Sequence, residues 1–108
     1  MITALLQTRL PEPVSLEQAR EMFRRTAPSY QSSPGLIRKY YLVSEDRSTI
    51  GGVYLWRSRE DAERIYTPKW REYVKQTFGE YPSLTWFDTP LVVDNLTGEL
   101  IEQDLPCE

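Results

Sequence analysis

The chain has 108 residues, which fits one domain, and its 40% hydrophobic and 27% charged residues are ordinary for a globular protein. Its net charge of −3 disfavours a general binder of nucleic acid or of an anionic membrane, because either needs a basic surface. The sequence has no histidine, which disfavours zinc hydrolysis, histidine-ligated haem and Ser-His or Cys-His catalysis within this chain.

The N-terminal segment predicts a strand followed by a helix. Residues 2–8 (ITALLQT) form a β-compatible run that is closed by prolines. Ser15 stands three residues before Gln18, which is the capping-box spacing, and apolar residues then recur with the helical period. We expect Pro28 to stop this helix, because proline lacks the N–H that continues the hydrogen-bond ladder.

The central segment predicts a β-hairpin. After a turn at residues 32–35 (SSPG), residues 36–43 (LIRKYYLV) form the clearest strand, with apolar or aromatic side chains at both parities. Residues 44–52 are predicted to be a polar turn, and residues 53–56 (VYLW) the partner strand. A strand that is apolar on both faces has to lie between two layers, and the second layer is expected from another subunit.

The C-terminal half predicts a split helix and a last strand. Ser58 caps the first part, Thr67 caps a second part that starts at the following proline, and Gly79 ends it. Residues 83–93 (SLTWFDTPLVV) form the final strand, in which Pro90 indicates an edge position or a bulge.

The order of elements predicts an α+β fold. Strand, helix, strand, strand, split helix and strand make a βαββαβ pattern, which is the ferredoxin-like arrangement of a four-stranded antiparallel sheet with helices on one face. This single domain is expected to span residues 1–95, with a polar tail at 96–108 that is partly ordered at best. Sheet-to-sheet packing in a homodimer would cover the open face, and a heterodimer would do so equally well.

Two absences bear on location. Cys107 is the single cysteine, so no intrachain disulfide is possible, which fits a reducing compartment. The sequence shows neither a signal-peptide pattern nor an apolar run of roughly 20 residues that would span a membrane. We therefore expect a cytoplasmic protein with no membrane partner.

Five segments carry a family resemblance. They are PGLIRKYYLVSED at 34–46, GGVYLW at 51–56, SREDAERIY at 58–66, TPKWREYV at 67–74 and FDTPLVVDN at 87–95. On these residues the chain resembles the YdhR-like monooxygenase family, which belongs to the dimeric α+β barrels. The resemblance implies a homodimer with packed sheets and a small pocket in each subunit between the sheet and the helices.

The resemblance also implies an activity. Characterised relatives oxygenate aromatic polyketides without flavin, haem or metal, so it implies a cofactor-independent monooxygenase of a small aromatic, phenolic or quinol-like substrate, with no cofactor and no metal. Haem degraders of the same fold hold iron through histidine, which this chain lacks. Two alternatives stay open: a non-catalytic dimeric binder of small hydrophobic molecules, and an isomerase or lyase that uses the same pocket.

Candidate site residues follow from what such a reaction needs. An apolar pocket must hold the aromatic ring, a group must favour loss of a substrate proton, and donors must stabilise the resulting anion. Lys39 is the candidate that binds the anion and lowers the substrate pKa, and Asp88 is the candidate base. The candidate substrate-binding residues are Arg38, Tyr41, Tyr54, Trp56, Tyr66, Trp70, Tyr73 and Trp86.

Each candidate has a structural alternative. Large aromatic residues are more often core or dimer packing than ligand contacts. Because strand residues alternate, only one of Arg38 and Lys39 is expected to face the pocket, and an interfacial ion pair or a snorkelling side chain explains either equally well. Asp88 also fits an exposed carboxylate at a sheet edge, and the pair Gly51-Gly52 fits a hairpin end or a close backbone approach at the interface.

Overall fold

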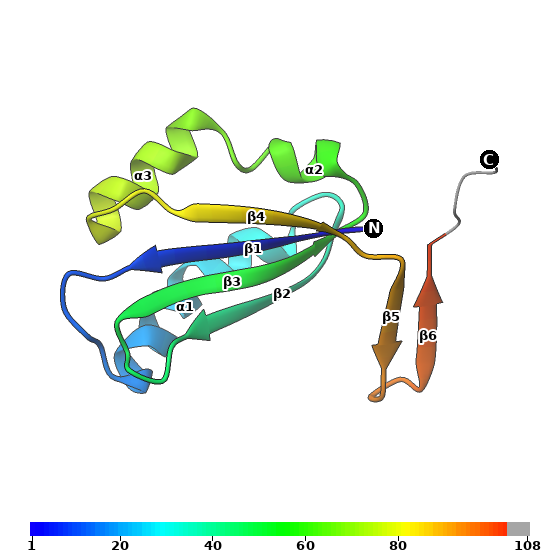
Figure 1. The fold of residues 1–108 in the computed structure, drawn as a ribbon, viewed down its shortest axis with the longest axis horizontal. Coiled ribbons are helices and arrows are strands. Elements are labelled where there is room, and N and C mark those ends of the chain that lie inside the picture. The colour runs from blue at the N-terminus through cyan, green and yellow to red at the C-terminus, as the bar shows by residue number, and fades with distance from the viewer. Residues whose placement is uncertain (104–108) are drawn as a thin grey trace.

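A computed structural model describes residues 1–103, and its centre is a four-stranded antiparallel sheet in the order β2-β3-β1-β4 (Figure 1). The strands are β1 (Ile2–Arg9), β2 (Leu36–Val43), β3 (Thr49–Trp56) and β4 (Ser83–Asp88). β1 lies between β3 and β4 and is antiparallel to both, which leaves β2 and β4 at the edges. This confirms the predicted ferredoxin-like arrangement.

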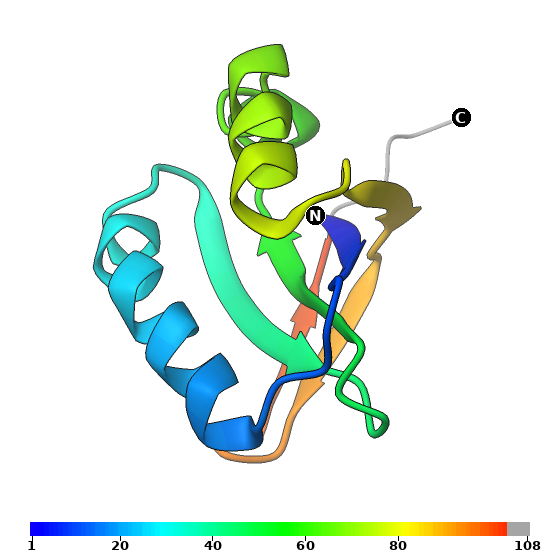
Figure 2. The ribbon, with the colours of Figure 1, turned by 90° about the vertical axis from the view of Figure 1, so that its left-hand side faces the viewer.

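Helices α1 (Leu16–Gln31), α2 (Arg59–Glu63) and α3 (Pro68–Phe78) cover one face of the sheet (Figure 2). Their predicted starts are confirmed. The Ser15 hydroxyl accepts a hydrogen bond from the Gln18 N–H at 3.0 Å, and the Thr67 hydroxyl accepts one from the Trp70 N–H at 3.2 Å. α3 ends at Gly79, whose φ of 99° is a left-handed conformation that glycine adopts without strain.

Alternate strand residues build the core between the sheet and the helices. Ala4, Leu6, Tyr54 and Trp56 point toward the helices and are buried together with Ala62 of α2. Within residues 1–103 no helix covers the opposite face of the sheet (Figure 2), which a hairpin at residues 91–102 contacts through Arg38 and Asp94. Exposed apolar side chains on that face include Tyr40 (56% exposed), Leu42 (39%) and Phe87 (51%).

The prediction that Pro28 ends the first helix is wrong, because α1 continues to Gln31. Proline removes one N–H donor, and the loss is confined to the last turn of the helix. In that turn the Ser29 hydroxyl donates to a carbonyl three residues earlier at 2.7 Å, and the ring of Tyr30 packs edge-on against Tyr54 at 5.6 Å. Packing of Tyr30 onto the sheet therefore outweighs the missing bond.

The predicted turn over residues 44–52 is too long, because β3 begins at Thr49 and contains Gly51 and Gly52. The ladder with β1 continues through both glycines. A Cβ atom on Gly51 would collide with the carbonyl oxygen of Leu6 on that neighbouring strand. Glycine thus serves close approach inside a strand and not the turn itself.

The predicted last strand over residues 83–93 is two strands. β4 ends at Asp88, and β5 (Leu91–Asp94) pairs with β6 (Glu99–Glu102) in a separate two-stranded sheet. Pro90, which has no N–H for a ladder, lies in the break between them. β6 falls in the predicted tail, so the first part of that tail is ordered, whereas Cys107 lies outside the described residues.

The β5–β6 hairpin extends from the end of the sheet, next to the start of β1 (Figure 1). Its attachment includes a hydrogen bond from the Thr89 N–H to the carbonyl oxygen of Met1 at 3.0 Å. One face of the hairpin, with Val92 and Ile101, is half-buried. The other face exposes Leu91 and Leu100, which are 48% and 65% exposed.

Candidate functional site

An apolar cavity of about 90 Å³ lies between the sheet and the helices. α1 and α3 form its walls, and β1, β2 and β3 form its floor. Its lining residues are Leu6, Thr8, Met22, Phe23, Thr26, Tyr30, Lys39, Tyr41, Ile50, Gly51, Tyr54, Trp70, Tyr73, Val74 and Phe78. The volume is below the roughly 300–1,000 Å³ of pockets that enclose drug-sized ligands, so the cavity fits a small ligand.

Lys39 is the one charged side chain in this lining. Its position depends on a bulge in β2, where the register shifts between Leu36 and Arg38. After the bulge Lys39 lies opposite Tyr54 and points toward the helices, whereas Arg38 lies opposite Leu55 on the other face. The sequence left open which of the two basic residues faces the pocket, and the bulge decides it.

Three tyrosine rings surround the Lys39 ammonium group. Its Nζ lies 3.5 Å from the ring centroid of Tyr30, 3.8 Å from that of Tyr41 and 4.4 Å from that of Tyr54. These distances are well within the range of about 6 Å over which a cation is attracted to an aromatic face. The rings come from α1, β2 and β3, so the fold itself assembles the cage.

Burial lowers the pKa of Lys39 from 10.5 to about 7. None of the ion pairs within residues 1–103 involves this side chain, so no carboxylate holds its charge. The tyrosine faces act in the opposite direction, because they stabilise the ammonium form. Both the amine and the ammonium are therefore accessible near neutral pH, which is the range in which a general base is most effective.

Hydroxyl groups complete the polar part of the lining. The hydroxyls of Thr26 and Tyr41 are hydrogen-bonded at 2.6 Å, and the Tyr41 ring stacks on Phe23 at 4.6 Å. Burial raises the pKa of Tyr41 and, more strongly, that of Tyr54. Both phenols are therefore neutral donors at physiological pH and not bases.

Gly52 makes room for the lysine. A Cβ atom there would lie 3.1 Å from the carbonyl oxygen of Tyr40 and from a ring carbon of Tyr54, and 3.3 Å from Cε of Lys39. Such distances are tighter than ordinary van der Waals contacts. The glycine thus lets the Lys39 side chain cross the sheet surface beside the Tyr54 ring.

The structure brings some of the predicted site residues to this cavity and places others in the core. Lys39, Tyr41, Tyr54, Trp70 and Tyr73 line the cavity. Their roles in binding and catalysis stay predictions.

Trp56, Tyr66 and Trp86 instead form an aromatic cluster next to the cavity. The Trp56 indole is fully buried and donates to the Tyr66 hydroxyl at 3.1 Å. The rings of Tyr66 and Trp86 meet edge-on at 5.7 Å. These three side chains pack against one another, which fits core packing, the structural alternative to substrate binding.

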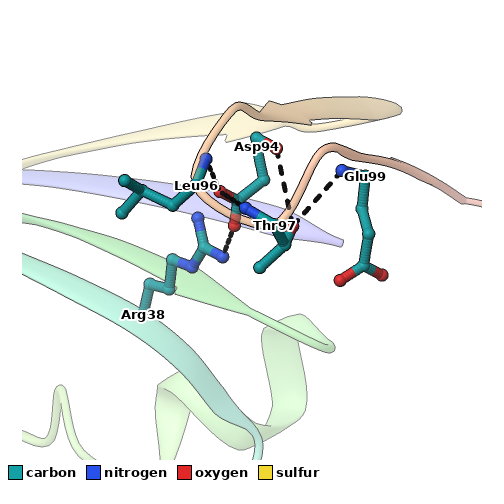
Figure 3. Close-up of polar contacts among 5 residues, drawn as sticks. All are labelled: Arg38, Asp94, Leu96, Thr97 and Glu99. Atoms are coloured by element: carbon teal, nitrogen blue, oxygen red, sulfur yellow. Dashed lines mark hydrogen bonds and ion pairs between the residues drawn. The ribbon is translucent and has the colours of Figure 1, made fainter.

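Arg38 and Asp88 also lie outside the cavity. The Arg38 guanidinium pairs with the Asp94 carboxylate of the β5–β6 hairpin (Figure 3). Asp94 is 5% exposed and accepts further hydrogen bonds from the N–H groups of Leu96 at 3.0 Å and Thr97 at 3.3 Å. Asp88 is exposed at the end of edge strand β4.

Sequence reasoning missed the contributions of α1. Phe23, Thr26 and Tyr30 all face the cavity. Their spacing of three and four residues places them on one helix face, and this spacing can be read from the sequence. Tyr30 was not assigned to that face because the helix was expected to stop at Pro28.

Residues 1–103 contain no group of three or more Cys, Asp or Glu side chains arranged to hold a metal ion. No helix in this part of the chain is long and apolar enough to cross a membrane.

Residues 5–81 match the family described as Putative mono-oxygenase ydhR. This match covers more than half of the chain and confirms the predicted resemblance. The chain belongs to this family. No curated protein matches this member of the ydhR family.

Solved structures share its fold. A monooxygenase from the gene ActVA-Orf6 of Streptomyces coelicolor, in complex with nanaomycin D, has 14% identity and a TM-score of 0.62, covering 82% of this chain and 86% of the other. SnoaB, a cofactor-independent oxygenase from Streptomyces nogalater, has 15% identity and a TM-score of 0.60, covering 82% and 91%. At these identities the likeness establishes the fold of this ydhR family member but not the reaction that it catalyses.

Proposed function

We propose that this protein is a cofactor-independent monooxygenase that oxidises a small phenolic or quinol-like substrate in the Lys39 cavity. The observation that carries the proposal is a single lysine, with its pKa lowered to about 7, inside an otherwise uncharged aromatic cavity. Membership of the ydhR family and the fold shared with SnoaB support the reaction class.

The lysine has two roles in this proposal. As a neutral amine, Lys39 takes the acidic proton of the substrate, and the ammonium that results then stabilises the substrate anion beside it. The hydroxyls of Thr26 and Tyr41, which lie 2.6 Å apart, offer a hydrogen bond to the same anion. The anion supplies the electrons that reduce oxygen: a C–O bond forms and the ammonium returns its proton, which gives a hydroperoxide. Its O–O bond then breaks as the same carbon loses its remaining C–H proton, which leaves a carbonyl group in the product and releases water.

Oxygen uptake tests this function. Purified protein treated with a chelator is given a panel of anthrones and hydroquinones, and uptake is compared with the rate without enzyme. Lys39→Met is expected to lower kcat by about 100-fold or more, the usual contribution of a positioned acid–base group. Lys69→Met, on an exposed position of α3, is the matched control and should keep the wild-type rate. Equal rates in both variants would refute the role of Lys39.

The homodimer is part of the proposal. Tyr40, Leu42 and Phe87 expose apolar surface on the uncovered face of the sheet, and packing two such faces together would bury it. Sedimentation of the wild type should give twice the mass of one chain. Leu42→Glu replaces an exposed side chain, so it should give a folded monomer, and a dimer that persists in this variant would locate the interface elsewhere.

A further inference from the structure

Lys39 lies at the boundary between two hollows of the molecule. The first is the inner cavity, and the second is a surface depression of about 260 Å³ between the end of α1 and the start of β2. Tyr30, Lys39 and Tyr41 line both. The Lys39 side chain therefore borders the surface depression as well as the inner cavity.

Burial of Lys39 without an ion-pair partner favours a nucleophilic amine, while the surrounding tyrosine rings stabilise its ammonium form. No ion pair within residues 1–103 engages its Nζ, and its three nearest ring centroids are 3.5 to 4.4 Å away. Desolvation in apolar surroundings is one of the ways in which proteins activate a lysine toward carbonyl groups. The lowered pKa leaves a large share of this amine unprotonated near neutral pH.

We propose that Lys39 is a carbonyl-reactive lysine, which condenses reversibly with small aldehydes and ketones that enter through the depression beside Tyr30. The nitrogen lone pair attacks the carbonyl carbon, and the carbonyl oxygen takes up a proton while the nitrogen loses one. Loss of water from this carbinolamine then gives an imine, and hydrolysis reverses the step. No oxidant, metal or cofactor takes part, so the inference does not depend on the oxygenase function.

Reductive trapping tests the inference on the wild-type chain. The protein is incubated with propanal and sodium cyanoborohydride at about pH 7, where an ordinary lysine of pKa about 10.4 is almost wholly protonated. The chain contains two other lysines, Lys69 and Lys75, and both are exposed on α3. Peptide mass spectrometry then compares propylation of all three lysines within the same molecules.

Propylation of Lys39 is expected to exceed that of either other lysine by about ten-fold or more, and unfolding in urea should abolish the difference. Equal or weaker propylation of Lys39 in the folded protein would overturn the inference. The outcome is separable from the oxygenase test. Selective trapping without oxygen uptake would refute only the oxygenase, and oxygen uptake without selective trapping would refute only the carbonyl chemistry.

A second pair of variants tests the access route. Gln31 is exposed and lines the depression but not the inner cavity, so Gln31→Trp should narrow the route and slow the trapping of Lys39 several-fold. Gln76→Trp makes the same change on an exposed position of α3 and should leave the rate unchanged. Equal trapping rates in the two variants would show that the aldehyde does not enter beside Tyr30.

Discussion

Replacing Lys39 by methionine should make the protein more stable, and the gain should depend on pH. Methionine keeps an unbranched chain of similar length and removes the charge. Burial holds the pKa of Lys39 at about 7 against 10.5 when exposed. Between these two pH values the unfolded chain binds a proton that the folded chain does not. Stability of the wild type therefore rises with pH across this window, and it is lowest below about pH 7, where the buried amine is charged.

The magnitude follows from the size of the pKa change. Each pKa unit corresponds to about 1.4 kcal/mol, so the full change would amount to several kcal/mol. We reduce this to about 2 kcal/mol, because Lys39 is only partly buried and its ammonium faces three tyrosine rings. Lys39→Met should thus raise the free energy of unfolding by about 2 kcal/mol at about pH 6, and most of this gain should vanish by about pH 9.5.

Urea unfolding followed by tryptophan fluorescence measures the difference, with the protein concentration held fixed in case a dimer dissociates. The groups that face Lys39 are the phenols of Tyr30, Tyr41 and Tyr54. Wild type and variant share these rings, so the difference between them isolates the effect of the lysine. Lys69→Met, at an exposed position of α3, is the control. A gain for Lys39→Met that is equal at both pH values, or a loss of stability at the lower one, would refute the reasoning.

Three further substitutions test the packing around the site. Gly52→Ala places a methyl group 3.3 Å from Cε of Lys39 and should cost about 1–3 kcal/mol of stability by urea unfolding; a neutral effect would show that the lysine moves aside freely. Trp56→Ala empties a fully buried position and should lower the free energy of unfolding by about 3–5 kcal/mol. Trp86→Ala at a half-buried position should cost clearly less, and the reverse order would contradict the assignment of Trp56 to the core. Asp94→Asn removes a buried charge from its guanidinium partner and should speed amide hydrogen exchange in the β5–β6 hairpin, whereas unchanged exchange would mean that the ion pair does not hold it.

Local signals in the sequence were sufficient for the helix starts and for the end of α3. Ser15 and Thr67 satisfy N–H groups only three residues away, and Gly79 adopts a left-handed φ that few other residues tolerate. These requirements act within one turn of the chain, so they can be predicted without knowledge of the rest. The ferredoxin-like arrangement followed from the order of these elements along the chain.

Features that depend on distant contacts could not be predicted in this way. α1 passes Pro28 because Tyr30 packs on Tyr54, a residue from another element. Gly51 lies inside a strand because the backbone of β1 approaches it closely. β5 pairs with β6 in a separate sheet, although the polar sequence of the β6 segment suggested a tail. In each case a tertiary contact overrides the local preference of the chain.

The candidate site shows the same division between local and distant causes. The structure places part of the predicted aromatic group along the cavity, and sequence alone did not separate the cavity lining from the core. Trp56 and Tyr41 both lie on strands and face the helices, yet only Tyr41 borders the cavity. The difference arises from which helix covers each residue, because Tyr41 lies under α1, where Phe23 stacks on its ring.

Three separate features converge on one amine. A β-bulge turns Lys39 toward the helices, Gly52 clears the space for its side chain, and a helical turn beyond Pro28 brings Tyr30 over its Nζ. Each of these features has a local cost: a bulge interrupts a ladder, glycine weakens a strand, and proline costs a hydrogen bond. A buried lysine with no carboxylate partner adds to the cost, and an apolar side chain would avoid it. Local compromises that all serve one buried amine are expected at a functional site rather than in a structural core.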